Sequence, residues 1–186
     1  ANSDDPSAKA LTLEPLQREM TVQDLLRHTS GLTYAHLTGP HLKQAYETAS
    51  VIDERQTNAE MAEKLAKVPL AYQPGTTFQY GVSTDMLGRV VEVASGMSLD
   101  RFIDERICKP LGLLKTSFGP IDGSRAAQPQ IDSASGKRPP MRDTSVRPNW
   151  ISGGSGLLST AGDYVRLCQM LLNGGELGGA RLLAPR

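Results

Sequence analysis

PGTTFQYGVSTD, residues 74–85, is the stretch from which the fold of the surrounding chain can be predicted. Pro74-Gly75 is a typical turn pair, and the residues up to Tyr80 favour a short extended segment. Ser83 or Thr84 can cap a helix that follows directly. A phenol just before a helix feels the partial positive charge of exposed backbone N–H groups, which favours its anion. The stretch therefore predicts that Tyr80 can act as a base, although a tyrosine after a turn also suits a half-buried packing role.

Three segments carry a resemblance to a known family. Residues 72–100 around Tyr80 closely resemble the second-motif region of the serine β-lactamase and penicillin-recognising hydrolase family, and most of all its esterase and class C-like members. MTVQDLLRHTSGL at residues 20–32 is similar to a helix and turn that many members carry. NWISGGSGLLSTAGDY at residues 149–164 is similar to the family's glycine cluster and the helix after it. The resemblance covers most of residues 15–186.

The resemblance implies a fold class. We expect a mainly α chain, with an irregular lead-in over residues 1–14 and, over residues 15–186, the helical domain and adjoining loops of a β-lactamase/transpeptidase-like fold. The parent fold is α/β with a central antiparallel sheet, which would be built mainly from other segments. This chain should then expose apolar surface where the sheet belongs, and could self-associate through it.

The family acts by nucleophilic acyl transfer from a Ser-x-x-Lys helix. The resemblance implies that Tyr80 is the proton-handling tyrosine of the parent enzyme. No serine in these 186 residues has a lysine three positions later, and no Lys-Thr-Gly motif is found. We therefore expect an internal piece of a serine hydrolase that is inactive alone, whose parent cleaves esters, or alternatively β-lactams or amides as a β-lactamase or D,D-peptidase does.

Two further residues are predicted to contact substrate. Penicillin-hydrolysing members usually carry Tyr-x-Asn, whose amide can bond the substrate, but Val82 stands at the third position here. An apolar residue there favours ester over amide chemistry, unless its side chain points away. Trp150, the only tryptophan, is predicted to line the pocket, with a packing role as the alternative. His28 is interpreted as a structural residue at a helix end, with Gly31 as the left-handed stop.

Composition excludes several function classes. Twenty basic and twenty acidic residues give no net charge, so nothing suggests a nucleic-acid partner. No apolar stretch is long enough for a membrane span. Cys108 and Cys168 lack metal-ligand spacing and are predicted to be small core residues. We expect no metal and no cofactor, and composition does not distinguish cytoplasm from periplasm.

Apolar periodicity predicts the remaining helices. Thr21 should cap the first helix with Asp24 as its capping partner. Further helices are expected over residues 42–51, 58–68 with Asn58 as cap, 83–94, 99–109 with Pro110 ending it, and 160–172, with a last helix starting at 183–185. The 160–172 helix should bury Tyr164, Leu167, Cys168, Leu171 and Leu172. Residues 119–148 are expected to form a long loop or two short strands, with a hairpin tip at 133–137.

Two other functions compete with this interpretation. A non-catalytic helical interaction module could keep the same scaffold, and its full reading frame would then lack Ser-x-x-Lys. A different hydrolase could use Ser155, but Gly153-Gly154-Ser155-Gly156-Leu157 does not match Gly-x-Ser-x-Gly at its last position.

Overall fold

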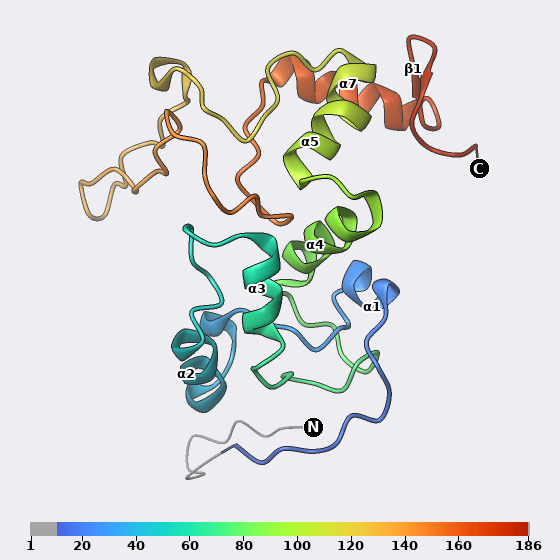
Figure 1. Cartoon of the computed structure of the whole chain (residues 1–186). Helices are drawn as coiled ribbons and strands as arrows, with labels where there is room; N and C mark the ends of the chain where they lie inside the picture. Colours follow the sequence, from blue (N-terminus) through green and yellow to red (C-terminus); the bar gives the residue numbers. More distant parts are fainter. Residues whose placement is uncertain (1–10, 186) are drawn as a thin grey trace. The chain divides into compact units, whose positions relative to one another are not determined.

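The computed structural model describes residues 11–185, which form two compact units (Figure 1). The first unit contains the described residues up to 102 together with 149–156, and the second contains residues 103–148 and 157 onward. Most of the predicted lead-in lies outside the described residues, and residues 11–14 have no regular structure. No helix of residues 11–185 has the length and apolar character that crossing a membrane requires.

Short helices joined by long loops build the first unit. Its elements are α1 (Val22–Arg27), η1 (Ala35–Leu37), α2 (Pro40–Thr48), α3 (Asn58–Leu65), α4 (Ser83–Ser95) and α5 (Leu99–Ile103), whose last residue belongs to the second unit. The α-helices were predicted and η1 was not. α2 starts two residues earlier than expected, and both α2 and α3 end three residues earlier. Contacts between α1 and α4 and between α3 and α4 make α4 the central helix of this unit.

Helix caps explain where these helices start. Thr21 and Asp24 form the predicted capping box of α1. On α3 the prediction was one residue off, because Thr57 is the cap and pairs with Glu60. The prediction for α4 was also wrong, since the helix already includes Ser83 and no side chain caps it. Ser83 is instead fully buried, so its hydroxyl is used in packing rather than capping.

One apolar core supports the first unit. Its buried members come from α1, α2, α3 and the loops that follow each of them, and are Leu25, Leu32, Leu42, Tyr46, Val51, Met61, Leu65, Ala71 and Val82. Met86, Leu87 and Val90 of α4 pack on this cluster as partly buried residues. Burial of this apolar surface is the main force that holds the loops around α4.

At the start of the second unit the helix continues past the point where Pro110 was predicted to end it. α5 passes into a π-helical turn, η2 (Asp104–Cys108), and then into α6 (Lys109–Leu111), so Pro110 lies inside the helix. A π-turn shifts the hydrogen-bond pattern locally, and a residue without an N–H can then be accommodated. Gly112, with φ of 66°, ends the helix in the left-handed region, where glycine is favoured.

The remaining elements of the second unit are η3 (Gly123–Arg125), α7 (Ala161–Leu172), β1 (Glu176–Leu177) and β2 (Ala180–Arg181). β1 and β2 pair antiparallel, with Glu176 opposite Arg181, across a two-glycine turn of positive φ that such hairpins favour. Residues 119–148 form the long-loop alternative, and the expected tip at 133–137 is a hydrogen-bonded turn. The helix expected from 183 is absent in the described residues up to 185.

The orientation predicted for α7 was right for Leu167 and wrong for the other four residues. The inward side carries Asp163, Leu167 and Met170, which follow each other at helical spacing, and Met170 belongs to the second core with Cys108, Leu111 and Leu113. Tyr164, Cys168, Leu171 and Leu172 are exposed, the last to 82%. Cys108 is buried as predicted but Cys168 is not. The helix has two apolar stripes, and in this chain only one of them is covered.

Candidate functional site

Tyr80 lies three residues before α4 with 54% of its surface exposed. Its ring contacts two others. The centroid of His28 is 5.1 Å away at an interplanar angle of 36°, and that of Tyr34 is 5.6 Å away in an edge-on arrangement. Aromatic pairs at these separations attract each other and restrict ring motion. Tyr80 is therefore an open phenol whose ring is supported from two segments.

Backbone hydrogen bonds align the Tyr80 segment with the turn after α1. Ala71, Gly75 and Gln79 donate from their backbone N–H groups to the carbonyl oxygens of Gly31 at 2.8 Å, Thr29 at 2.7 Å and His28 at 2.8 Å, respectively. These bonds run in opposite chain directions, as in a short antiparallel pair. Residues 28–31 and 71–79 are therefore one bonded unit that fixes the base of Tyr80.

Close backbone contact continues past Tyr80. A Cβ atom on Gly81 would lie 2.4 Å from the Cα of Thr33, so only glycine fits there without a shift. Beyond it, the hydroxyls of Ser30 and Ser83 are 2.8 Å apart and fully buried. The turn after α1 is thus joined to the first residue of α4.

His28 ends α1 in the left-handed conformation, with φ of 54°. This corrects the prediction that Gly31 is the helix stop. Gly31 has its own positive φ of 84°, and a Cβ there would lie 2.2 Å from the carbonyl oxygen of Tyr72, so both the conformation and the space favour glycine. The Nε2 atom of His28 is 3.4 Å from the hydroxyl of Thr84. The sequence pattern indicates only a helix-end role for His28, and its ring contact with Tyr80 is visible only in the structure.

A buried carboxylate lies behind Tyr34. Asp85, in the first turn of α4, accepts hydrogen bonds from the Tyr34 hydroxyl at 3.4 Å and from the Ser152 hydroxyl. Burial raises the pKa of Tyr34 to about 12, and the nearby Asp85 carboxylate adds to the effect, because both disfavour a phenolate. Tyr34 therefore stays a proton donor to Asp85, while its ring supports Tyr80.

The glycine cluster also packs on α4. A Cβ on Gly153 would lie 2.3 Å from the Thr84 carbonyl oxygen, and one on Gly154 would lie 3.0 Å from an Asp85 carboxylate oxygen. The main chain at these two glycines therefore passes directly against α4. Asp85 and Ser152 were missed because their partners are far apart in the sequence.

Trp150 is half-buried and anchored elsewhere in the first unit. Its indole N–H donates to the side-chain oxygen of Asn58 at 3.0 Å, and its ring packs on the first core. The Asn58 amide in turn donates to Ile151 O at 2.8 Å and to the Glu92 carboxylate at 3.0 Å. In the described residues, the ring contacts of Tyr80 are with His28 and Tyr34, so a pocket role for Trp150 stays a prediction.

Val82 has no exposed surface and packs in the first core. The substrate contact predicted for it therefore has no open surface through which to act in this structure. The alternative, in which the side chain points away from substrate, agrees with this burial. Val82 instead fixes the end of the Tyr80 loop to the core.

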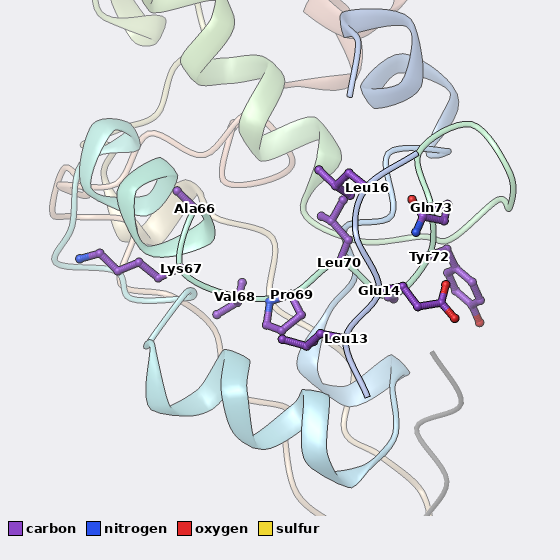
Figure 2. Close-up of a pocket in the computed structure, with 11 residues that line it drawn as sticks. Leu13, Glu14, Leu16, Ala66, Lys67, Val68, Pro69, Leu70, Tyr72 and Gln73 are labelled. Atoms are coloured by element: carbon purple, nitrogen blue, oxygen red, sulfur yellow. The ribbon is translucent and has the colours of Figure 1, made fainter. Parts of the chain in front are cut away.

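An apolar cavity of about 350 Å³ lies elsewhere on the first unit. Figure 2 shows its walls, which come from Leu13, Glu14 and Leu16 on one side and from residues 66–73 on the other. None of the three predicted site residues lines it. We therefore assign no substrate binding to this cavity and base the candidate site on the open face of Tyr80.

Comparison with known proteins gives a consistent result. A family profile described as Beta-lactamase matches residues 2–186. Esterase EstB from Burkholderia gladioli is 33% identical over 85% of this chain and 45% of its own length. A putative D-alanyl-D-alanine carboxypeptidase from Escherichia coli (strain K12) is 30% identical over 88% of this chain and 41% of its own length.

A solved structure shares the fold. EstCE1, described as a hydrolase with promiscuous acyltransferase activity, superposes with a TM-score of 0.73 at 26% identity, over 88% of this chain and 48% of that one. The chain spans less than half the length of these relatives. The similarity thus extends over nearly the whole chain but over only part of each relative.

Proposed function

Because the chain belongs to the Beta-lactamase family, we propose that it is part of a serine hydrolase that cleaves ester bonds through an acyl-enzyme, with Tyr80 handling the proton. The serine and lysine of the family's Ser-x-x-Lys motif would come from residues beyond these 186. The 186-residue chain alone would then be inactive, because no attacking hydroxyl is paired with a lysine in it.

One observation carries the proposal. The Tyr80 phenol is open on one side while its ring rests on His28 and Tyr34. A proton-transfer group must reach the reacting atoms and must also hold a fixed geometry. A tyrosine that served only for packing would not need an exposed face of this size supported from two separate segments.

In the proposed reaction the lysine of the motif first takes the phenolic proton of Tyr80, and Tyr80 then accepts the proton of the serine hydroxyl while the serine oxygen attacks the ester carbonyl. The proton is then passed to the departing alcohol oxygen as the ester bond breaks. Water hydrolyses the acyl-serine in the second half of the cycle.

Ester substrates are proposed in preference to β-lactams and peptides. The support for this preference is the similarity to EstB, which is described as an esterase. The runner-up, D,D-peptidase or β-lactamase activity, is supported by the similarity to the putative D-alanyl-D-alanine carboxypeptidase. A helical interaction module without catalysis is the other alternative, and it requires a reading frame that lacks Ser-x-x-Lys.

The test uses the longer protein encoded with this chain and, as control, the 186 residues alone. Initial rates on p-nitrophenyl acetate and butyrate are compared with rates on nitrocefin and on a D-alanyl-D-alanine peptide. We expect the longer protein to cleave the short esters fastest and the 186-residue chain to cleave none. A clear preference for nitrocefin or for the peptide would contradict ester cleavage and support β-lactamase or D,D-peptidase activity instead.

A further inference from the structure

His28 stands at a position where another residue would suit the backbone better. Its φ of 54° lies in the left-handed region, and among the described residues other than glycine only Ser50 shares a positive φ. Glycine and asparagine adopt this conformation at helix ends at lower cost than histidine does. The helix-ending conformation of residue 28 therefore does not by itself explain why this residue is a histidine.

The imidazole ring contacts two aromatic side chains of the loop before α4. Its centroid is 5.1 Å from that of Tyr80 and 5.8 Å from that of Phe78. The backbone carbonyl of His28 also accepts a hydrogen bond from Gln79, the residue between them. Both the main chain and the ring of His28 thus contact the segment that carries Tyr80.

Hydrogen bonding by the ring does not explain its placement. The Nε2 atom lies 3.4 Å from the Thr84 hydroxyl, which is near the limit of a hydrogen bond. The Nδ1 atom is buried and has no hydrogen-bond partner among the described residues. A buried polar atom without a partner costs free energy, so the ring is held by packing rather than by its nitrogens.

We propose that His28 is a positioning residue for Tyr80, and this inference rests on the proposed function of Tyr80. The left-handed turn at the end of α1 directs the imidazole against the Tyr80 ring, and Tyr34 closes the arrangement from a second direction. The phenol ring can then rotate less. His28 acts through Tyr80 and exchanges no proton with substrate.

Two substitutions separate this role from helix capping. His28→Asn keeps a residue suited to the left-handed helix end but removes the ring, whereas His28→Phe keeps a ring but removes the nitrogens. His41→Asn, on α2, is the matched control. Each is made in the 186-residue chain, at concentrations where sedimentation shows a monomer, and in the longer hydrolase.

The readout in the chain is the NMR signal of tyrosine labelled with ¹³C in the ring, with Tyr80 assigned from the spectrum of Tyr80→Phe. We expect His28→Asn to remove the ring-current shift of Tyr80 without lowering the melting temperature. His28→Phe should keep a ring-current shift, and His41→Asn should change nothing. In the longer protein, His28→Asn should lower kcat about tenfold with KM unchanged, since small misplacements of reacting groups are costly, and His28→Phe should restore most of the rate.

An unchanged Tyr80 signal in His28→Asn would overturn the inference. Loss of the folded chain in His28→Asn and in His28→Phe would also overturn it, because His28 would then serve the fold itself. Both outcomes are measured on the 186-residue chain, by NMR and by its melting temperature, and neither measurement depends on catalytic activity. If Tyr80→Phe left the activity of the longer protein intact while His28→Asn still released the Tyr80 ring, the proposed function would be wrong and the contact between the two rings would remain.

Discussion

Gly81 passes so close to Thr33 that a Cβ atom at position 81 would lie 2.4 Å from the Thr33 Cα. Real Cβ contacts do not occur at this distance, and the obstacle is backbone that cannot rotate away. The contact brings the residue after Tyr80 against the residue before Tyr34. The two rings therefore meet because the two main chains do.

Gly81→Ala should destabilise the first unit. Overpacking against backbone typically costs about 1–3 kcal/mol, and the free energy of unfolding measured with urea should fall by that amount. Gly123→Ala is the control, because a Cβ at position 123 meets open space. Equal stability of Gly81→Ala and the control would show that the contact with Thr33 is looser than described.

Acid should weaken the start of α1. The Arg18 guanidinium, followed by the Thr21 cap, holds the pKa of the Asp24 carboxyl well below its usual range, with both Arg18 nitrogens 2.7 Å from the carboxylate oxygens. A carboxyl whose pKa is lowered by folding stabilises the fold above its unfolded pKa, about 3.9, and loses that contribution as the pH falls further. The melting temperature should therefore drop below about pH 4.

Asp24→Asn tests the origin of that drop. The variant should melt earlier at neutral pH and show a smaller further loss between pH 4 and pH 2. Glu63→Gln, an exposed carboxylate on α3, should leave the pH profile of the chain unchanged. If the melting temperature of Asp24→Asn fell with pH in parallel with that of the unsubstituted chain, Asp24 would not be the cause of the loss of stability in acid.

The uncovered stripe of α7 should make the chain associate. Leu171 and Leu172 are exposed beside Tyr164 and Cys168, and an apolar patch of this kind favours contacts between molecules. Substitution of both leucines by glutamine should shift the sedimentation profile toward the monomer. The control is Leu114→Gln, at the most exposed leucine of the second unit. It should leave the sedimentation profile unchanged.

Local signals in the sequence predicted the local structure correctly. The Thr21 and Asp24 capping box is confirmed because both partners lie within one helical turn. The expected shortage of sheet agrees with the single two-stranded hairpin in the described residues. The beta-lactamase-like family is confirmed by the family match over residues 2–186.

Features that depend on distant partners could not be predicted in the same way. Two apolar stripes on α7 are equally good candidates for burial until its neighbours are known, and the one without Asp163 was chosen wrongly. Asp163 faces inward because it accepts hydrogen bonds from the backbone of Lys115 and the hydroxyl of Thr116. Asp85 was likewise overlooked because its partners, Tyr34 and Ser152, are 51 and 67 residues away.

The most direct test of the account is the rate of the acylation step in Tyr80→Phe of the longer hydrolase. Stopped-flow release of p-nitrophenol from p-nitrophenyl acetate reports this step, and removal of a general base usually costs about 10² to 10⁴ in rate. We predict a loss in that range, with circular dichroism and melting temperature unchanged because the Tyr80 ring contacts persist in phenylalanine. An acylation rate equal to that of the unsubstituted enzyme would contradict the assignment of Tyr80 as the proton-handling residue.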